Sequence, residues 1–267
     1  MYSSSLGYET EIGNSYYNSQ SQETRPYALV YKGPGVNEAC HDNTVEALSR
    51  LINNSVVKGY DSSYVESGQV PNGSVLFIPG GHALDLDSGL GERGFSAIKN
   101  GLDNGVYGGY FGTCAGAIAA CAYYNINGQS YPSTGYFPEL EVAAELLPAT
   151  TPLKLERMGY TGDGYSANEF HGLRAASPSF EIMPENETTQ VVAKYLDAES
   201  ERYKAAVVVD SGRYVLAGHH WEIPQDFSYG GFPDSKGKDL IYSSQAEQDR
   251  LTCYLCQYLG LDPKNPQ

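Results

Sequence analysis

The sequence predicts an α/β fold in which a doubly wound, mostly parallel central sheet is flanked by helices. Short apolar runs alternate with stretches of helical periodicity, and several runs are apolar throughout, like strands buried on both faces. Glycine-rich turns follow several of these runs. A length of 267 residues with 41% hydrophobic residues fits one large domain. We expect that domain at residues 26–267, after a polar, poorly ordered arm at residues 1–25.

The first half of the chain carries a clear strand and helix pattern. Tyr27–Tyr31 predicts a buried strand that stops at the tight loop of residues 33–35, with the sequence GPG. Apolar residues at helical spacing over residues 41–52 predict a helix, and Asp42–Thr44 are expected to cap its start. The next elements are expected to be a strand at residues 54–60, a strand at Ser74–Gly81, a helix at Phe95–Asp103, a strand at Val106–Gly112 and a helix at Ala115–Tyr124.

The second half of the chain has weaker signals. Residues 125–190 are expected to be rich in loops. Three later apolar runs predict strands, QVVAKYL at residues 190–196, KAAVVVD at 204–210 and RYVLAGHH at 213–220. An amphipathic helix is expected at Glu247–Gly260. The chain has no internal repeat and no linker that would divide the domain.

The sharpest candidate for chemistry is Cys114, which lies between a predicted strand and a predicted helix in the sequence GTCAGA. Small residues flank a nucleophile at a sharp strand-to-helix turn, because bulkier neighbours do not fit there. The helix N-terminus would stabilise the thiolate, which is the reactive form of cysteine. The alternative is a small buried cysteine beside a tight turn.

A base for this thiol is expected after a later strand. His220 follows the apolar run Tyr214–Ala217 and so lies at the carboxyl end of a strand, the edge that holds binding sites in open α/β sheets. Glu222 would fix the imidazole tautomer and support its positive charge. His219 is the second choice for the base. The alternative is a His-His pair in a surface loop or a metal-touching loop.

Acyl transfer also needs hydrogen-bond donors for the oxyanion. The candidates are the backbone N–H groups of Gly81, after the third strand, and of Ala115, after the nucleophile; without the elbow, the PGG segment at residues 79–81 would be simply a turn. The remaining residues expected to line the pocket are Gly33, Gly35, Gly80 and Trp221.

Three motifs in order resemble one superfamily. A strand that ends in PGG, a later GTCAGA elbow and a still later H-x-E after a strand resemble the class I glutamine amidotransferase-like superfamily, whose sheet is flavodoxin-like. More narrowly, the chain resembles the amino-terminal domain family of biotin–protein ligases and would be a free-standing bacterial-type member. The segments that carry this narrower resemblance are YKGPGVNEACHDNTVEALSRLI, FIPGGHALDL, GGYFGTCAGAIAAC and LLPATTPLKLERMGYTGDGYSANEF. The resemblance extends from about Tyr27 to Leu259.

The resemblance implies roles for individual residues. It implies that Cys114 is the nucleophile, His220 the base and Glu222 the third member of a triad, with the oxyanion donors on Gly81 and Ala115. Trp221 stands where the superfamily often has proline, and it would add bulk near the site. No synthetase domain or ligase domain accompanies the triad, so we expect neither a classical amidotransferase role nor biotin ligation.

The other cysteines have several interpretations. Cys40 opens the first predicted helix, beside the switch point of the sheet, and could approach Cys114 as a redox partner or simply occupy a helix start. Cys253 and Cys256 form a C-x-x-C that would be a redox pair, half of a metal site, a structural disulfide or core packing. No second Cys/His pair completes a zinc site, so we expect no metal and no cofactor.

Composition restricts the partners. A net charge of −15 argues against nucleic-acid binding, and no apolar run approaches the ~18 residues that span a bilayer. A small-molecule substrate of unknown identity is therefore expected, and a homodimer is compatible with the sequence. Many Tyr and Gly residues and few Lys residues favour an exported protein over a cytoplasmic one, although the first residues do not form a signal peptide.

Two functions are compatible with the sequence. The first is a cysteine-dependent hydrolase or amidotransferase-like enzyme that acts on a small amide or ester through Cys114, His220 and Glu222. The alternative is a catalytically silent module that uses the same pocket to bind a small ligand or a protein.

Overall fold

The computed structural model describes residues 26–134, 136–137, 140–146, 153–161, 169–182, 188–196, 204–227 and 233–264. The arm expected at residues 1–25 lies outside these ranges. The helices are α1 (Glu38–Leu51), α2 (Ser62–Glu66), α3 (Ala83–Gly89), α4 (Gly91–Asp103), α5 (Ala115–Ala120) and α6 (Ser235–Tyr258), with a short 3₁₀ helix η2 (Asp210–Gly212).

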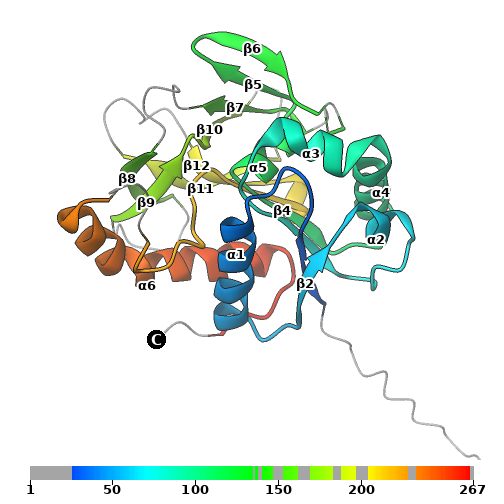
Figure 1. Cartoon of the computed structure of the whole chain (residues 1–267), viewed down its shortest axis with the longest axis horizontal. Coiled ribbons are helices and arrows are strands. Elements are labelled where there is room, and N and C mark those ends of the chain that lie inside the picture. Colours follow the sequence, from blue (N-terminus) through cyan, green and yellow to red (C-terminus); the bar gives the residue numbers. More distant parts are fainter. Residues whose placement is uncertain are drawn as a thin grey trace, which may run out of the picture.

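Thirteen strands of the described residues form one sheet (Figure 1). They are β1 (Ala28–Tyr31), β2 (Val56–Tyr60), β3 (Val75–Ile78), β4 (Gly109–Thr113), β5 (Tyr123–Ile126), β6 (Gln129–Pro132), β7 (Val142–Leu146), β8 (Leu153–Tyr160), β9 (Phe170–Ala175), β10 (Pro178–Ile182), β11 (Gln190–Tyr195), β12 (Lys204–Val209) and β13 (Tyr214–Ala217).

The strand order confirms the predicted α/β fold class. The sheet runs β2-β1-β3-β4-β13-β12-β10-β7-β5-β6, and β11, β8 and β9 branch from β12. Strands β2, β1, β3, β4 and β13 pair in parallel and form the doubly wound centre. Beyond β13 the pairing is antiparallel as far as β7, after which β5 is again parallel to β7.

Side chains of the central strands alternate between two cores. Leu29 and Tyr31 point to the side covered by α2, α3, α4 and α5, whereas Ala28 and Val30 point to the side covered by α1 and α6 (Figure 1). Because both faces are covered, the strands are apolar throughout and lack the polar alternation of a half-exposed sheet. This is the physical reason that the continuous apolar runs predicted a parallel sheet.

The register of the central strands brings the predicted site residues to one edge. Ile78 of β3 lies opposite Gly112 of β4, and Ala217 of β13 lies opposite Thr113. The segments that follow these strands therefore leave the sheet side by side. They contain Cys114 and the pair His219 and His220, together with the PGG turn of residues 79–81.

Several boundaries differ from the sequence expectation. Among the described residues of 125–190, strands rather than loops predominate, because the end of β5, the strands β6 to β10 and the start of β11 lie there. Helix α1 begins earlier than predicted, since Asn37 rather than Asp42–Thr44 caps it, with its Oδ1 accepting from the Ala39 N–H at 2.9 Å. Helix α5 ends at Ala120, and α6 begins at Ser235, where Asp234 caps it.

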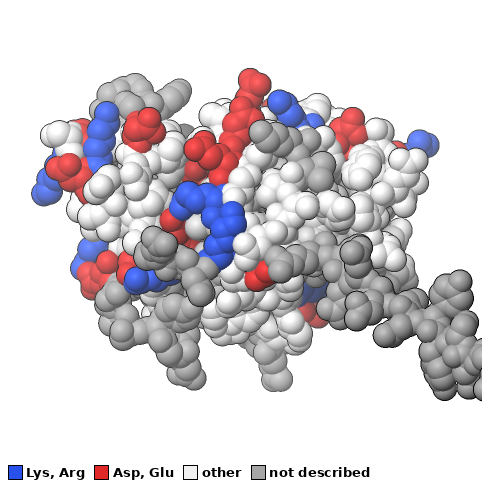
Figure 2. Space-filling view, turned by 90° about the horizontal axis from the view of Figure 1, so that it is seen from below, with Lys and Arg blue, Asp and Glu red and all other residues white. Residues whose placement is uncertain are grey.

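None of the described helices combines the length and apolar character needed to cross a membrane. On the face shown in Figure 2, the coloured Lys and Arg side chains lie beside Asp and Glu side chains, so these residues form no extended basic field there. This agrees with the acidic net charge of −15.

Candidate active site at the carboxyl edge of the sheet

Cys114 occupies a strained turn between β4 and α5. Its φ of 50° and ψ of −107° are unusual for a residue with a side chain. The flanking glycines are required by close backbone packing. A Cβ on Gly112 would lie 2.6 Å from the Gly116 carbonyl, and a Cβ on Gly116 would lie 2.0 Å from the Ile78 carbonyl oxygen. The backbone around Cys114 therefore makes the sharp strand-to-helix turn that the GTCAGA sequence predicted, whereas the role of Cys114 as a nucleophile stays a prediction.

His220 and Glu222 form a buried pair on the loop after β13. His220 Nδ1 and Glu222 Oε1 are 2.7 Å apart, and the two residues are only 4% and 3% exposed. The backbone of this loop is held by the bond from the His220 N–H to the Leu173 carbonyl at 2.8 Å. The carboxylate therefore fixes which nitrogen of the ring is protonated.

The charges around His220 favour its protonated form. Burial opposes the charge, but Glu222 and Cys114 outweigh that effect and hold the pKa of His220 well above its usual value. His220 Nε2 and Glu222 Oε2 are buried, and within the described part of the chain neither has a hydrogen bond of ordinary geometry. Nε2 is thus the ring nitrogen left for a thiol or a substrate.

Cys114 is 5% exposed and lies near this imidazole. It is close enough to His220 to be one of the groups that raise the pKa of that imidazole. Its Sγ also contacts the Ala175 carbonyl oxygen at 3.8 Å. The structure therefore brings Cys114, His220 and Glu222 into one neighbourhood from segments about 100 residues apart in the chain.

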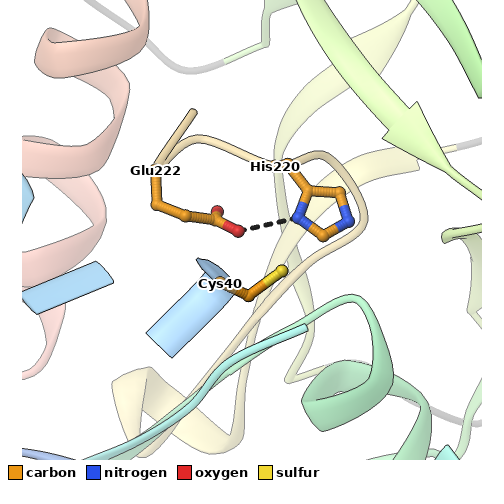
Figure 3. Close-up of side chains that lie close together, drawn as sticks. All are labelled: Cys40, His220 and Glu222. Atoms are coloured by element: carbon orange, nitrogen blue, oxygen red, sulfur yellow. Dashed lines mark hydrogen bonds and ion pairs between the residues drawn. The ribbon is translucent and has the colours of Figure 1, made fainter. Parts of the chain in front are cut away.

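Gly80 and Cys40 lie on the Nδ1 side of the ring. A Cβ on Gly80 would lie 2.5 Å from His220 Cε1 and 3.3 Å from both Nδ1 and the Cys40 Sγ. Figure 3 shows Cys40 reaching from α1 toward the His220–Glu222 pair. Burial raises the pKa of the Cys40 thiol, although His220 partly opposes this effect. The Cys40 thiol is close enough to both His220 and Cys114 for them to affect its pKa, and its role as a redox partner of Cys114 stays a prediction. Its position beside the His220–Glu222 pair was not expected.

Among the described residues, no hydrogen bond is found from the backbone N–H of either predicted oxyanion donor, Gly81 or Ala115. Gly81 pairs with Val36 in an antiparallel bridge. The two bonds of this bridge are made by the flanking residues, from Asn37 N–H to the Gly80 carbonyl and from His82 N–H to the Gly35 carbonyl. The Gly81 N–H therefore points away from Val36. Ala115 is the first residue of α5, so its N–H has no partner within the helix. Their convergence on one oxyanion stays a prediction.

Trp221 does not add bulk to a substrate pocket, contrary to the sequence expectation. Its side chain is 1% exposed and packs in the core on the α1 and α6 side of the sheet, 5.4 Å from the Phe111 ring between centroids. Its Nε1–H donates to Thr113 Oγ1 at 2.8 Å. Trp221 therefore anchors the His220 loop to β4, the strand that leads into the Cys114 turn.

Gly33 and Gly35 have structural roles in the GPG loop. A Cβ on Gly33 would meet the Tyr31 hydroxyl at 2.4 Å, and one on Gly35 would meet the Leu86 backbone nitrogen at 2.3 Å. Gly35 also has a φ of +89°, which favours glycine. The two glycines are thus required by close contacts with Tyr31 and with α3.

Three other candidate residues are buried away from solvent. Burial lowers the pKa of His219 to about 3, so this residue stays neutral and is unsuited to the role of second-choice base. Cys253 and Cys256 are free thiols in the core of α6, and burial raises the pKa of Cys253 to about 11. Of the interpretations of the C-x-x-C, core packing is the one that these surroundings support.

A cavity of about 440 Å³ lies beside Glu222, between α1 and α6. Its charged lining is mostly acidic, and Arg50 within it forms a bidentate ion pair with Asp249. The sequence contained no sign of this cavity because its walls come from three segments far apart in the chain. Its lining residues are Asn43, Glu46, Ala47, Arg50, Glu222, Ile223, Pro224, Gln225, Asp226, Gln245 and Asp249.

Comparison with known families agrees with the fold and with the motifs. Residues 27–131 match the family described as biotin-protein ligase, N terminal. No curated protein sequence matches the chain. The matched region contains the GPG loop, the PGG turn and the Cys114 elbow, but not His220 or Glu222.

Solved structures resemble the chain at low identity. One described as the crystal structure of glutamine amidotransferase has a TM-score of 0.55 and 20% identity, and the match covers 88% of this chain and 98% of that chain. The structure of PurLQS from Thermotoga maritima has a TM-score of 0.48 and 16% identity, with 84% and 98% covered. The first match shows that the chain has a glutamine amidotransferase-like fold.

Proposed function

From the glutamine amidotransferase-like fold and the match of residues 27–131 to the biotin-protein ligase N-terminal family, we propose that the chain is a cysteine-dependent hydrolase or amidotransferase-like enzyme. Its substrate would be a small amide or ester. The observation that carries this proposal is the 2.7 Å bond between His220 and Glu222 beside a cysteine held at a φ of 50°.

In the proposed reaction, the sulfur of Cys114 attacks the substrate carbonyl carbon. The thiol proton passes to Nε2 of His220, and Glu222 stabilises the resulting imidazolium through Nδ1. The N–H groups of Gly81 and Ala115 would bind the oxyanion. His220 then donates its proton to the leaving amine or alcohol, and a thioester remains on Cys114. Water activated by His220 hydrolyses this thioester and regenerates the thiol.

The second candidate is a silent binding module. Two observations favour it: Cys114 is only 5% exposed, and its Sγ contacts the Ala175 carbonyl instead of making an ordinary hydrogen bond to His220 Nε2. In that case the glycine-flanked turn and the buried pair would shape a pocket without chemistry.

Thiol modification at pH 6 separates the two functions. An ordinary thiol of pKa about 8.5 is only ~0.3% ionised at pH 6. In the proposed enzyme, His220 keeps a larger fraction of Cys114 in the reactive thiolate form. The thiolate of a more acidic thiol is also a weaker nucleophile, so we expect iodoacetamide to modify Cys114 only about tenfold faster than free cysteine. Peptide mass spectrometry assigns the modified residue. His220→Ala should remove the acceleration, and the matched control His82→Ala, which removes an exposed imidazole, should preserve it.

Acyl transfer itself is tested with p-nitrophenyl acetate and with L-glutamine. An active triad gives a burst of one equivalent of nitrophenolate and an acetylated Cys114 peptide, and Cys114→Ser abolishes both. Release of ammonia from glutamine would assign the amide class of substrate. A folded wild-type protein without a burst, and with Cys114 no more reactive than free cysteine, would leave the binding module as the function.

A further inference from the structure

One cluster beside the proposed active site has the composition of a metal site. The Sγ of Cys40, a ring nitrogen of His220 and a carboxylate oxygen of Glu222 all lie within 4.8 Å of one another. We propose that these three side chains bind a borderline-soft divalent cation of the Zn²⁺ class. Figure 3 shows the three side chains converging from α1 and from the loop after β13.

The distances require only small side-chain movements. Around a tetrahedral Zn²⁺, thiolate, imidazole and carboxylate ligands lie about 2.0–2.3 Å from the metal, which places them roughly 3.4–3.6 Å from one another. His220 Nδ1 and Glu222 Oε1, now 2.7 Å apart, would separate by a fraction of an ångström to admit the ion. Cys40 Sγ and His220 Nδ1 each lie 3.3 Å from the position that a Cβ on Gly80 would occupy, so the missing side chain of Gly80 leaves room between them.

The charges of the cluster suit a dication. Thiolate and carboxylate together neutralise two positive charges, which lowers the cost of burying the ion. Glu222 is 3% exposed, and its Oε2 has no hydrogen-bond partner among the described residues, so a cation would satisfy a buried anion that is now incompletely paired. The thiolate selects Zn²⁺ over Mg²⁺ and Ca²⁺, which prefer oxygen ligands. Water would fill the fourth position.

Metal binding and the proposed catalysis would exclude each other. The ion displaces the thiol proton of Cys40 and the Nδ1 proton of His220 to solvent, and no other bond changes. Glu222 then binds the metal instead of orienting the imidazole, and the nearby dication opposes imidazolium formation. This inhibitory consequence rests on the proposed function, whereas the metal site itself does not.

Cobalt titration of the full chain tests the site without any turnover. Co²⁺ replaces Zn²⁺ in such sites and gives charge-transfer absorption when it binds a thiolate. We expect one equivalent to bind with this absorption and to be displaced by Zn²⁺. Cys40→Ala should abolish the absorption, and Glu222→Gln should weaken the affinity at least tenfold. Cys253→Ala, which removes a buried thiol elsewhere, is the matched control and should change neither.

Two results would overturn the metal site. One is the absence of cobalt–thiolate absorption in the wild-type protein; the other is absorption that survives in a folded Cys40→Ala or Cys40→Ser variant. The inhibitory consequence has its own test, since Zn²⁺ should slow the p-nitrophenyl acetate burst in the wild type but not in Cys40→Ala. Equal inhibition of both proteins would refute that consequence, whereas a missing burst would refute the proposed function and leave the cobalt result to decide the site.

Discussion

Gly80→Ala tests whether the position of the His220 ring controls the chemistry of Cys114. The added methyl would lie 2.5 Å from His220 Cε1, and the ring must move by about 0.9 Å to restore an ordinary contact of 3.4 Å. The substitution changes neither member of the His220–Glu222 pair. Any effect on Cys114 would therefore come from displacement of the base.

The expected loss follows from this displacement. A misplacement of about 1 Å in a catalytic geometry costs roughly 100-fold in rate. We expect the first-order rate constant of the p-nitrophenyl acetate burst to fall by about that factor. Overpacking of the site should also lower the free energy of unfolding by about 1–3 kcal/mol.

The control is Gly159→Ala on β8. Its added methyl meets the end of the flexible Leu196 side chain at 3.1 Å, far from the elbow in the sheet order. The burst rate constant should stay within about twofold of the wild type in this variant. Stopped-flow absorbance gives the rates, and circular dichroism establishes that both variants are folded. A folded Gly80→Ala protein with a wild-type burst would show that the ring position does not limit the reaction.

The remaining predictions concern stability, measured by urea unfolding followed by circular dichroism. Trp221→Phe leaves the buried Thr113 hydroxyl without its donor and should lower the free energy of unfolding by about 1–3 kcal/mol. Adding Thr113→Val should recover at least 0.5 kcal/mol of this loss. If the losses of the two single variants simply add, the bond between Trp221 and Thr113 does not contribute to stability. Arg174→Met removes one of the two cations that pair with Glu156, which is 0% exposed, and leaves Lys154; it should cost up to about 3 kcal/mol, partly recovered by Glu156→Leu. A loss below 1 kcal/mol would show that the pair is dispensable. Asn37→Ala removes the cap of α1 and should lower the free energy of unfolding by about 1 kcal/mol, whereas Asn37→Ser should lower it little. Equal losses in the two variants would show that Asn37 does not stabilise α1 by capping it.

The central sheet was predictable because its cause is local. Strands such as Ala28–Tyr31 and Tyr214–Ala217 are buried on both faces, and a continuous apolar run is the direct consequence. The strands within residues 125–190 were missed because they break this pattern. β6 is exposed along its length, and β8 mixes charged and apolar residues, so neither has a run or a regular alternation to detect.

The site was predictable where chemistry imposes a local pattern. The glycines are visible because they flank Cys114 within six consecutive residues, and Glu222 is visible because it follows its partner His220 by two residues. The Ile78 carbonyl that excludes a side chain at Gly116 is distant in the chain and was not visible. The direction of Trp221 was not visible, since its partner Thr113 is 108 residues away and only the β4–β13 register brings them together. The position of Cys40 beside the base is likewise set by tertiary structure.

The two nitrogens of His220 explain how one imidazole could serve two exclusive states. Nε2 has no ordinary hydrogen bond and is available to the Cys114 side of the site, whereas Nδ1 lies between Glu222 and Cys40. A proton on Nδ1 pairs with the carboxylate and leaves Nε2 basic, which is the state that acyl transfer needs. A metal ion on Nδ1 takes the same carboxylate and adds positive charge, so the ring becomes a poor proton acceptor. Removing the Cys40 thiol should abolish only the metal-bound state, whereas removing the His220 imidazole should abolish both.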